Sequence, residues 1–289
     1  MSNRNTWPLA VSLCARLHPT ESDFIEMAQA GIKAIELSYA YALYSRIEWN
    51  NLQRYTQNHG VVPWSMHLPF EHQTANPAHP DAAVRAATFR FDRELAEKAA
   101  DIGVKVLVLH PSGEPIEEEE RTESMKRSKE FLSKLTDLAD TLGLKVAVEN
   151  LPRTCLGRNA ADMAELLEDS RLYACFDTNH LLMDSHTDLI NTVPGRILTL
   201  HVSDYDFINE RHWLPGEGKI DWPKLIAALE KADYVGPWLY EVSRIPEKTI
   251  VRRPLVWRDF AENRAALMAG KQPERFGFPL SDPLPMWID

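Results

Sequence analysis

Eight short runs of apolar residues recur along the chain, and longer segments with a helical pattern separate most of them. The runs span residues 9–14, 33–38, 61–68, 105–110, 145–150, 172–177, 197–202 and 238–243. Each run is rich in β-branched or aliphatic residues and alternates little, which is typical of strands that are buried on both faces. The pattern therefore predicts eight strands of a largely parallel sheet.

Amphipathic helices are expected between these strands. They fall at residues 19–31, 80–103, 117–143, 222–234 and 252–270. Gly103 and Gly143 come just before a strand, as turns from helix to strand require. The first strand is not followed by the glycine-rich turn of a dinucleotide-binding sheet. We therefore predict the α/β class and a single (β/α)8 barrel, in preference to an open doubly wound sheet.

The barrel is expected to occupy residues 1–270. Residues 271–289 fall outside the alternation and are rich in proline and aromatic residues. They are expected to form a short C-terminal tail that packs on the barrel or on a neighbouring subunit.

Composition narrows the class of partner. The net charge of −10 gives no overall attraction to nucleic acid or to an anionic membrane. No apolar segment approaches the length of about 18 residues that a membrane span needs. The three cysteines form no CxxC pattern, and this favours reduced thiols in a cytoplasmic protein.

Ionisable residues stand at the carboxyl ends of seven of the predicted strands, which is where barrels of this kind carry their chemistry. They are Glu36, His67, His110, Glu149, Asp177, His201 and Glu241, with His180 just after Asp177. So many carboxylates and imidazoles at one mouth would repel one another or lose hydration without a cation. Their mixed oxygen and nitrogen donors suit Mn²⁺, Zn²⁺, Co²⁺ or Mg²⁺. The sequence therefore predicts a divalent metal site.

The segment NERHWLPGEGKIDW, residues 209–222, follows the seventh strand. Its proline and glycine residues predict a turn. Because His212 follows His201 by a short connection, we expect this segment to be a loop of the site.

The motifs VENL, FDTNH, HVSD, HWLPGEGKIDW and YEVS occur in this order on the last four predicted strands and the loops that follow them. Together they resemble the xylose isomerase-like barrel superfamily, and within it the sugar phosphate isomerase and epimerase group, with relatives among tagatose-type 3-epimerases and inosose dehydratases. The resemblance covers most of residues 8–268.

The resemblance implies a metal-dependent isomerase or epimerase of carbohydrate metabolism. One divalent ion would be bound by Glu149, Asp177, His201 and Glu241. Glu149 and Glu241 would also be catalytic: one removes the proton beside a carbonyl, leaving an enediolate, and the other returns a proton to the opposite face. The residues expected to contact a small carbohydrate substrate are His67, His110, His180, Arg153, Arg211, His212, Glu36 and Trp64.

Other functions remain open at this stage. A dehydratase acting on a keto-cyclitol would share the first proton abstraction, with His180 or Glu36 as the acid that protonates a leaving hydroxyl. A barrel that only binds sugar is a further alternative. The resemblance also extends to apurinic-site endonucleases of the endonuclease IV type, which use three zinc ions. Counterparts of their ligands are His67, His110, Glu149, Asp177, His180, His201, Glu210, His212 and Glu241, with Glu210 where that family has Asp.

The net charge and the resemblance also predict the binding partners. We expect no nucleic acid or membrane partner, and the resembling group implies a homodimer or homotetramer.

Overall fold

The eight predicted strands all form. The computed structural model describes residues 3–15, 18–246 and 248–280, and its strands lie within the apolar runs that predicted them. They are β1 (Leu9–Ser12), β2 (Ala34–Leu37), β3 (Val62–His67), β4 (Val106–Leu109), β5 (Lys145–Glu149), β6 (Leu172–Asp177), β7 (Ile197–His201) and β8 (Trp238–Tyr240).

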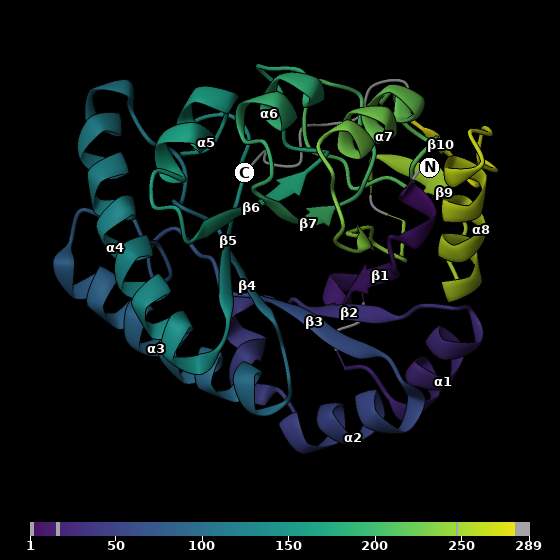
Figure 1. Cartoon of the computed structure of the whole chain (residues 1–289), viewed down its shortest axis with the longest axis horizontal. Coiled ribbons are helices and arrows are strands. Elements are labelled where there is room, and N and C mark those ends of the chain that lie inside the picture. Colours follow the sequence, from purple (N-terminus) through teal and green to yellow (C-terminus); the bar gives the residue numbers. More distant parts are fainter. Residues whose placement is uncertain (1–2, 16–17, 247, 281–289) are drawn as a thin grey trace.

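Parallel pairing joins the strands into a ring. Their order is β7-β6-β5-β4-β3-β2-β1-β8. Beyond the end of β7, the Val202 amide donates to the Leu239 carbonyl at 2.8 Å, and the Glu241 amide donates to the Val202 carbonyl at 3.1 Å. These bonds link β7 to β8, and Figure 1 shows the helices arranged around the strands. The predicted (β/α)8 barrel is therefore confirmed.

Eight α-helices cover the strands in the described part of the chain. They are α1 (Glu21–Gln29), α2 (Trp49–His59), α3 (Ala82–Asp101), α4 (Arg121–Leu142), α5 (Ala160–Leu166), α6 (His186–Thr192), α7 (Trp222–Lys231) and α8 (Trp257–Met268). Short 3-10 turns stand at η1 (Arg4–Thr6), η2 (Leu13–Ala15), η3 (Tyr41–Arg46) and η4 (Glu118–Glu120). The prediction omitted α2, α5 and α6. Helices α5 and α6 have seven residues each, too few to show a periodic apolar face.

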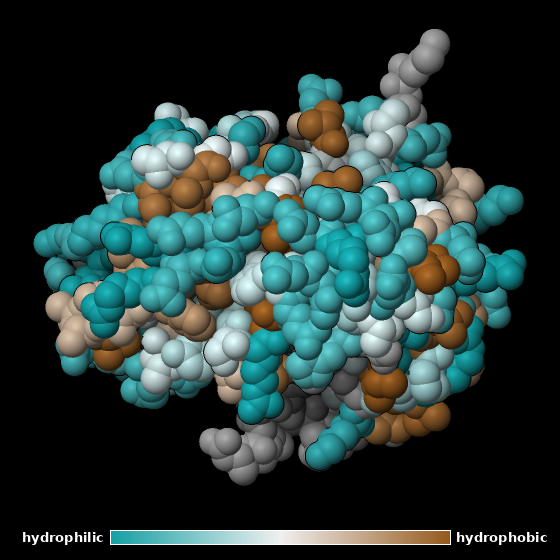
Figure 2. Space-filling view, turned by 90° about the horizontal axis from the view of Figure 1, so that it is seen from below, coloured by the Kyte–Doolittle hydropathy of each residue, from teal (hydrophilic) through white to brown (hydrophobic). Residues whose placement is uncertain are grey.

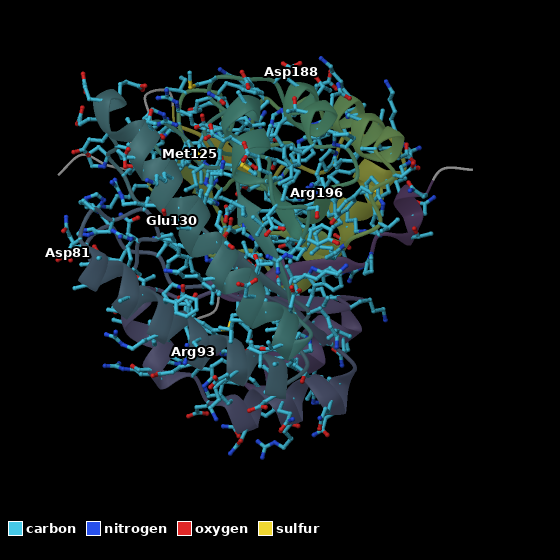
Figure 3. The ribbon with its side chains drawn as sticks, turned by 60° about the vertical axis from the view of Figure 1, so that its left-hand side comes forward. Asp81, Arg93, Met125, Glu130, Asp188 and Arg196 are labelled. Carbon is cyan, nitrogen blue, oxygen red and sulfur yellow. The ribbon has the colours of Figure 1, made fainter. Side chains whose placement is uncertain are left out.

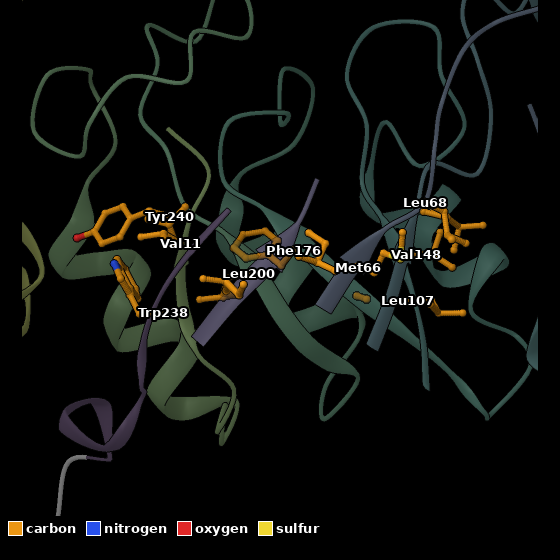
Figure 4. Close-up of a cluster of buried hydrophobic side chains, with 14 of the residues drawn as sticks. Val11, Met66, Leu68, Leu107, Val148, Phe176, Leu200, Trp238 and Tyr240 are labelled. Atoms are coloured by element: carbon orange, nitrogen blue, oxygen red, sulfur yellow. The ribbon is translucent and has the colours of Figure 1, made fainter. Parts of the chain in front are cut away.

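Large side chains on the outer face of the strands form the main core. Val11, Phe176, Leu200 and Trp238 lie in this layer between strands and helices (Figure 4). The barrel interior holds mostly smaller side chains such as Ala147, in clusters that contain no helix residue.

Trp64 fills the space left by the small interior side chains. It packs against both interior clusters, and its indole Nε1 donates to the Thr199 hydroxyl at 3.2 Å. The indole is therefore held inside the barrel wall, and its predicted contact with substrate stays a prediction.

Arg196, labelled in Figure 3, fastens the amino ends of β6 and β7. Its Nε donates to the Leu172 carbonyl at 2.9 Å and its Nη2 to the Asp169 carbonyl at 2.7 Å. The two strands then run in a register that pairs Asp177 with His201 at their carboxyl ends. The register thus brings two predicted metal ligands side by side.

An additional two-stranded sheet, which was not predicted from the sequence, forms after β8. It pairs β9 (Ile250–Arg252) antiparallel with β10 (Gly277–Pro279). The Arg275 guanidinium donates from Nη2 to the Glu217 carbonyl at 2.8 Å. Residues 271–280 of the predicted tail therefore lie against the loop between β7 and α7, and residues 281–289 lie outside the described residues.

One face of the molecule is mainly polar. On the face shown in Figure 2, hydrophilic side chains predominate and hydrophobic ones lie in small separate groups. Among the described residues, none of the helices combines the length and apolar character needed to cross a bilayer.

Candidate metal centre

Four residues from four consecutive strand ends converge at the barrel mouth. Glu149 ends β5, Asp177 ends β6, His201 ends β7 and Glu241 follows β8. One ligand atom from each lies within 4.8 Å of the ligand atoms of the others. Three carboxylates and one imidazole form a set of hard and borderline donors that suits a divalent ion. The structure thus brings together the four predicted ligands.

The burial and the hydrogen bonding of Asp177 support this assignment. Its Oδ1 accepts the Asn179 amide at 2.5 Å, whereas its buried Oδ2 has no hydrogen-bond partner among the described residues. Its nearest basic atoms are His180 Nδ1 at 3.6 Å and His201 Nδ1 at 3.8 Å. Burial raises the pKa of Asp177 to about 7. An unpartnered buried carboxylate oxygen beside other donors is the arrangement that a cation would relieve.

Glu149 lies at the centre of the polar cluster. Its Oε2 is 3.0 Å from His67 Nε2 and 3.5 Å from His110 Nε2. Its Oε1 is 3.1 Å from His201 Nδ1 and 3.4 Å from His180 Nδ1. Burial opposes ionisation, but the charge of His201 and the bonds from the surrounding imidazoles hold the pKa of Glu149 well below its usual value. Glu149 is therefore an ionised acceptor.

Glu241 is the more accessible of the two predicted catalytic carboxylates. Its side chain is 13% exposed, against 1% for Glu149, and its Oε2 lies 3.2 Å from His201 Nδ1. Burial raises its pKa, but the charge of His201 outweighs burial and lowers the pKa to about 2. Both carboxylates are thus available as bases at neutral pH.

Glu36 lies behind His201. The nitrogen Nε2 of His201 is 3.0 Å from Glu36 Oε1, and the Ser65 hydroxyl donates to Glu36 Oε2 at 2.8 Å. All three residues are buried. Glu36 therefore orients the imidazole so that Nδ1 faces the cluster, as acidic partners of metal-binding histidines do. Its predicted contact with substrate stays a prediction.

A second group of donors stands beside the first. Ligand atoms of His180, Glu210 and His212 lie within 4.8 Å of one another. The His180 nitrogens face Asn150 O at 3.0 Å and Glu210 Oε2 at 3.3 Å. Because both of these atoms are acceptors, both nitrogens of His180 carry hydrogen in this arrangement. A third group with the same spacing joins His67 and His110 to Glu149.

The two arginines that were predicted to contact substrate already have carboxylate partners. The Arg153 guanidinium contacts both Glu114 and Glu210. The Arg211 side chain is buried, and its Nε donates to Asp206 Oδ2 at 2.9 Å. Their predicted contacts with substrate stay predictions.

The loop of residues 209–222 is held by buried acids. Asp204 accepts from the Gly216 amide at 2.8 Å, the Ile220 amide at 3.1 Å and the Trp222 indole at 2.9 Å. A Cβ on Gly218 would stand 2.2 Å from Asp204 Oδ1, so only glycine fits there. The glycine-rich turn therefore serves as a support that places His212 at the mouth.

The sequence reading missed two neighbours of the site. Asn150 exchanges two hydrogen bonds with the Asp177 backbone, at 3.0 and 2.8 Å. Phe70 is 47% exposed and stacks on His110 with ring centroids 4.1 Å apart. Both could have been found from their distance in sequence to a predicted site residue, because Asn150 follows Glu149 directly and Phe70 stands three residues after His67.

The fold and mouth define a (β/α)8 barrel with a mixed oxygen and nitrogen site. A family model for the xylose isomerase-like TIM barrel matches residues 24–260. The chain belongs to that family, and the resemblance drawn from the motifs is confirmed.

Individual relatives are distant. An uncharacterised protein of Methanocaldococcus jannaschii is 25% identical over 181 residues, which span 59% of this chain and 61% of the relative, so the match covers less than two thirds of that protein. The D-psicose 3-epimerase of Agrobacterium fabrum is 25% identical over 249 residues, or 82% of this chain and 83% of the relative. A solved L-ribulose 3-epimerase is similar with a TM-score of 0.74 and 18% identity, covering 90% of this chain and 93% of that one.

Proposed function

We propose that this chain is a divalent-metal-dependent epimerase or isomerase of a ketose or similar small carbohydrate. The observation that carries the proposal is the convergence of Glu149, Asp177, His201 and Glu241, whose ligand atoms lie within 4.8 Å of one another. The unpartnered Asp177 Oδ2 supports it from within the same cluster. The likeness to named sugar 3-epimerases supports the substrate class.

Glu149, Asp177, His201 and Glu241 would hold the ion. When bound, a divalent ion supplies Lewis-acid polarisation of the substrate carbonyl.

Glu149 and Glu241 supply the base and the acid. One of Glu149 and Glu241 removes the proton from the carbon beside the carbonyl, and an enediolate remains. The other takes up a proton from solvent and delivers it to the opposite face, which inverts that carbon, and the first glutamate then releases its proton to solvent. His180 Nδ1 lies 3.4 Å from Glu149 Oε1, so the imidazole would stand beside a substrate held at Glu149. A substrate hydroxyl contacting His180 Nε2 would replace its present contact with Glu210.

Solvent deuterium tests the proposal. The purified protein with added Mn²⁺ is incubated with D-psicose, D-fructose, D-tagatose and a keto-cyclitol in D₂O. Incorporation at the carbon beside the carbonyl supports proton abstraction, and a product with one inverted centre identifies epimerisation. Loss of a hydroxyl with formation of an enol or alkene product would instead identify the dehydratase.

The catalytic assignment has its own variants. Glu149→Gln and Glu241→Gln should each lower turnover by about 10²- to 10⁴-fold, the range expected when a positioned base is lost. Glu262→Gln on α8 is the control because it removes a carboxylate from an exposed helix face. Unchanged turnover in both site variants, at unchanged metal content, would refute the assignment and favour a barrel that only binds sugar.

An abasic-site endonuclease is the second candidate, and one observation favours it. Besides the main cluster, the groups His67–His110–Glu149 and His180–Glu210–His212 each gather three donors within 4.8 Å. Three zinc ions per chain and chelator-sensitive cleavage of an abasic-site duplex would establish this function. About one ion per chain and an intact duplex would remove it.

A further inference from the structure

Arg153 contacts Glu210, the carboxylate that would be needed to bind a second metal ion. The neighbouring donors are His180, Glu210 and His212, with His180 Nε2 3.3 Å and His212 Nε2 3.9 Å from Glu210 Oε2. Two imidazoles and a carboxylate at this spacing are an adequate zinc site. Whether they bind an ion depends on the charge that already faces Glu210.

The guanidinium of Arg153 is fixed in place from several sides. Its Nε donates to Glu114 Oε2 at 3.0 Å, and its Nη2 contacts Glu114 Oε1. Its Nη1 donates to Asn209 Oδ1 at 2.8 Å and also contacts Glu210 Oε1. The backbone of Arg153 adopts a φ of 52°, in the left-handed region that side chains seldom occupy. The residue is therefore held by two neighbouring loops, the one with Glu114 and the one with Asn209 and Glu210, and is not a loose surface arginine.

The two carboxylate oxygens of Glu210 therefore have different partners. Oε1 pairs with Arg153, and Oε2 faces the two imidazoles. A guanidinium does not lose its proton in proteins, so its charge is permanent. Glu210 is 7% exposed, and at such a site a fixed positive charge strongly opposes a dication on the other oxygen of the same carboxylate.

We propose that Arg153 is a built-in cation that replaces a second metal ion at Glu210 and so limits the mouth to the single ion of the main cluster. The proposal rests on the proposed function, because it assumes one ion at Glu149, Asp177, His201 and Glu241. It also gives Arg153 a role other than the predicted contact with substrate. With its charge met by Arg153, Glu210 keeps the rings of His180 and His212 free of metal.

Metal stoichiometry tests the proposal without reference to turnover. Wild type, Arg153→Gln and Arg158→Gln are dialysed against the same buffered free Zn²⁺, and bound zinc is counted by plasma mass spectrometry. Arg158 is the matched control, because it pairs with Glu118 at 2.6 Å across the segments after β4 and β5, as Arg153 does with Glu114, but forms no ion pair with Glu210 among the described residues. Wild type and Arg158→Gln should hold one ion, and Arg153→Gln should hold two.

Affinity and location follow from two further measurements. Zinc titration should show that Arg153→Gln tightens the second site by at least about tenfold. Adding His212→Asn to Arg153→Gln should return the count to one, because a ligand of the second site is lost. If Arg153→Gln does not fold, as judged by circular dichroism, Arg153→Met keeps the aliphatic stem and takes its place.

The outcomes separate the two proposals. One ion in wild type and also in the Arg153 variant would overturn the role of Arg153 and leave the proposed function standing. Two ions in Arg158→Gln would trace the gain to a loosened loop and would also overturn it. No ion in wild type would overturn the single-metal function, and two or three ions in wild type would overturn both.

Discussion

Replacing Asp177 by asparagine should stabilise the metal-free protein while weakening metal binding. Asp177 is fully buried, and its Oδ2 has no hydrogen-bond partner among the described residues. The amide keeps the oxygen that accepts the Asn179 N–H, and it removes a charge that lies close to the carboxylates of Glu149 and Glu241. A residue selected for folding alone would not be an aspartate here.

The magnitude follows from the shifted pKa. Burial, followed by the neighbouring carboxylates, raises the pKa of Asp177 from 3.8 to about 7, which corresponds to about 4 kcal/mol of destabilisation of the ionised form. A raised carboxyl pKa gives stability that is present below pH 3.8 and is lost as the pH rises through about 7. Above that pH, Asp177→Asn should therefore raise the free energy of unfolding by up to about 4 kcal/mol, or roughly 8 °C in melting temperature.

Calorimetry with chelator or with Mn²⁺ measures both effects. In chelator at pH 8 the variant should melt above wild type, and at pH 4 the difference should vanish. With Mn²⁺ the order should reverse, because affinity should fall by more than the roughly 10- to 100-fold that loss of an outer-shell partner causes. Asp101→Asn, on the exposed end of α3, is the control for net charge. A chelated variant that melts at or below wild type would refute the reasoning.

Three other perturbations test neighbouring parts of the structure. Glu36→Gln should lower metal affinity by about 10- to 100-fold with little loss of stability, because the ring of His201 loses its orienting carboxylate; isothermal titration measures this. Glu217→Gln should destabilise the protein by about 3 kcal/mol in urea unfolding, because it leaves buried Arg252 without the ion pair at 2.8 Å. Burial lowers the pKa of His212, but the neighbouring carboxylate of Glu210 raises it by more, to about 9. In chelated protein, His212 should therefore contribute stability that is present below pH 6.5 and is lost as the pH rises through about 9. His212→Gln should remove that pH dependence of the melting temperature.

Each of these has a contrary result. Equal metal affinity in Glu36→Gln would mean that the ring of His201 is oriented by its backbone alone. Wild-type stability in Glu217→Gln would mean that the pair with Arg252 is balanced by its desolvation. A melting profile of His212→Gln parallel to wild type between pH 6.5 and 9 would show that the imidazole does not hold its proton there.

The pattern of apolar runs determined the barrel. Eight runs of buried-strand character separated by connecting segments leave few ways to cover every strand, and parallel pairing in chain order is the one observed. Shorter elements were harder to predict. Helices α5 and α6 are too short for a helical period to show. The paired strands β9 and β10 lie about 25 residues apart on either side of α8.

Strand ends also predicted which residues would meet. A parallel barrel gathers the carboxyl ends of its strands at one mouth, so the ionisable residues at seven strand ends could be placed there from the sequence. The resemblance to the family then singled out Glu149, Asp177, His201 and Glu241 among them. The sequence did not show which of the remaining predicted site residues contact the four ligands, because that depends on distances in the folded structure. Glu36 lies behind His201.

Only the tertiary structure decided what Arg153 faces. Its partners Glu114 and Glu210 come from loops after different strands, 39 and 57 residues away along the chain. The sequence alone determines which strand end carries each residue, because strands and helices alternate regularly along the chain. Loop conformation decides which charges finally pair, because many loop paths join the same two ends, and packing and hydrogen bonding select among them.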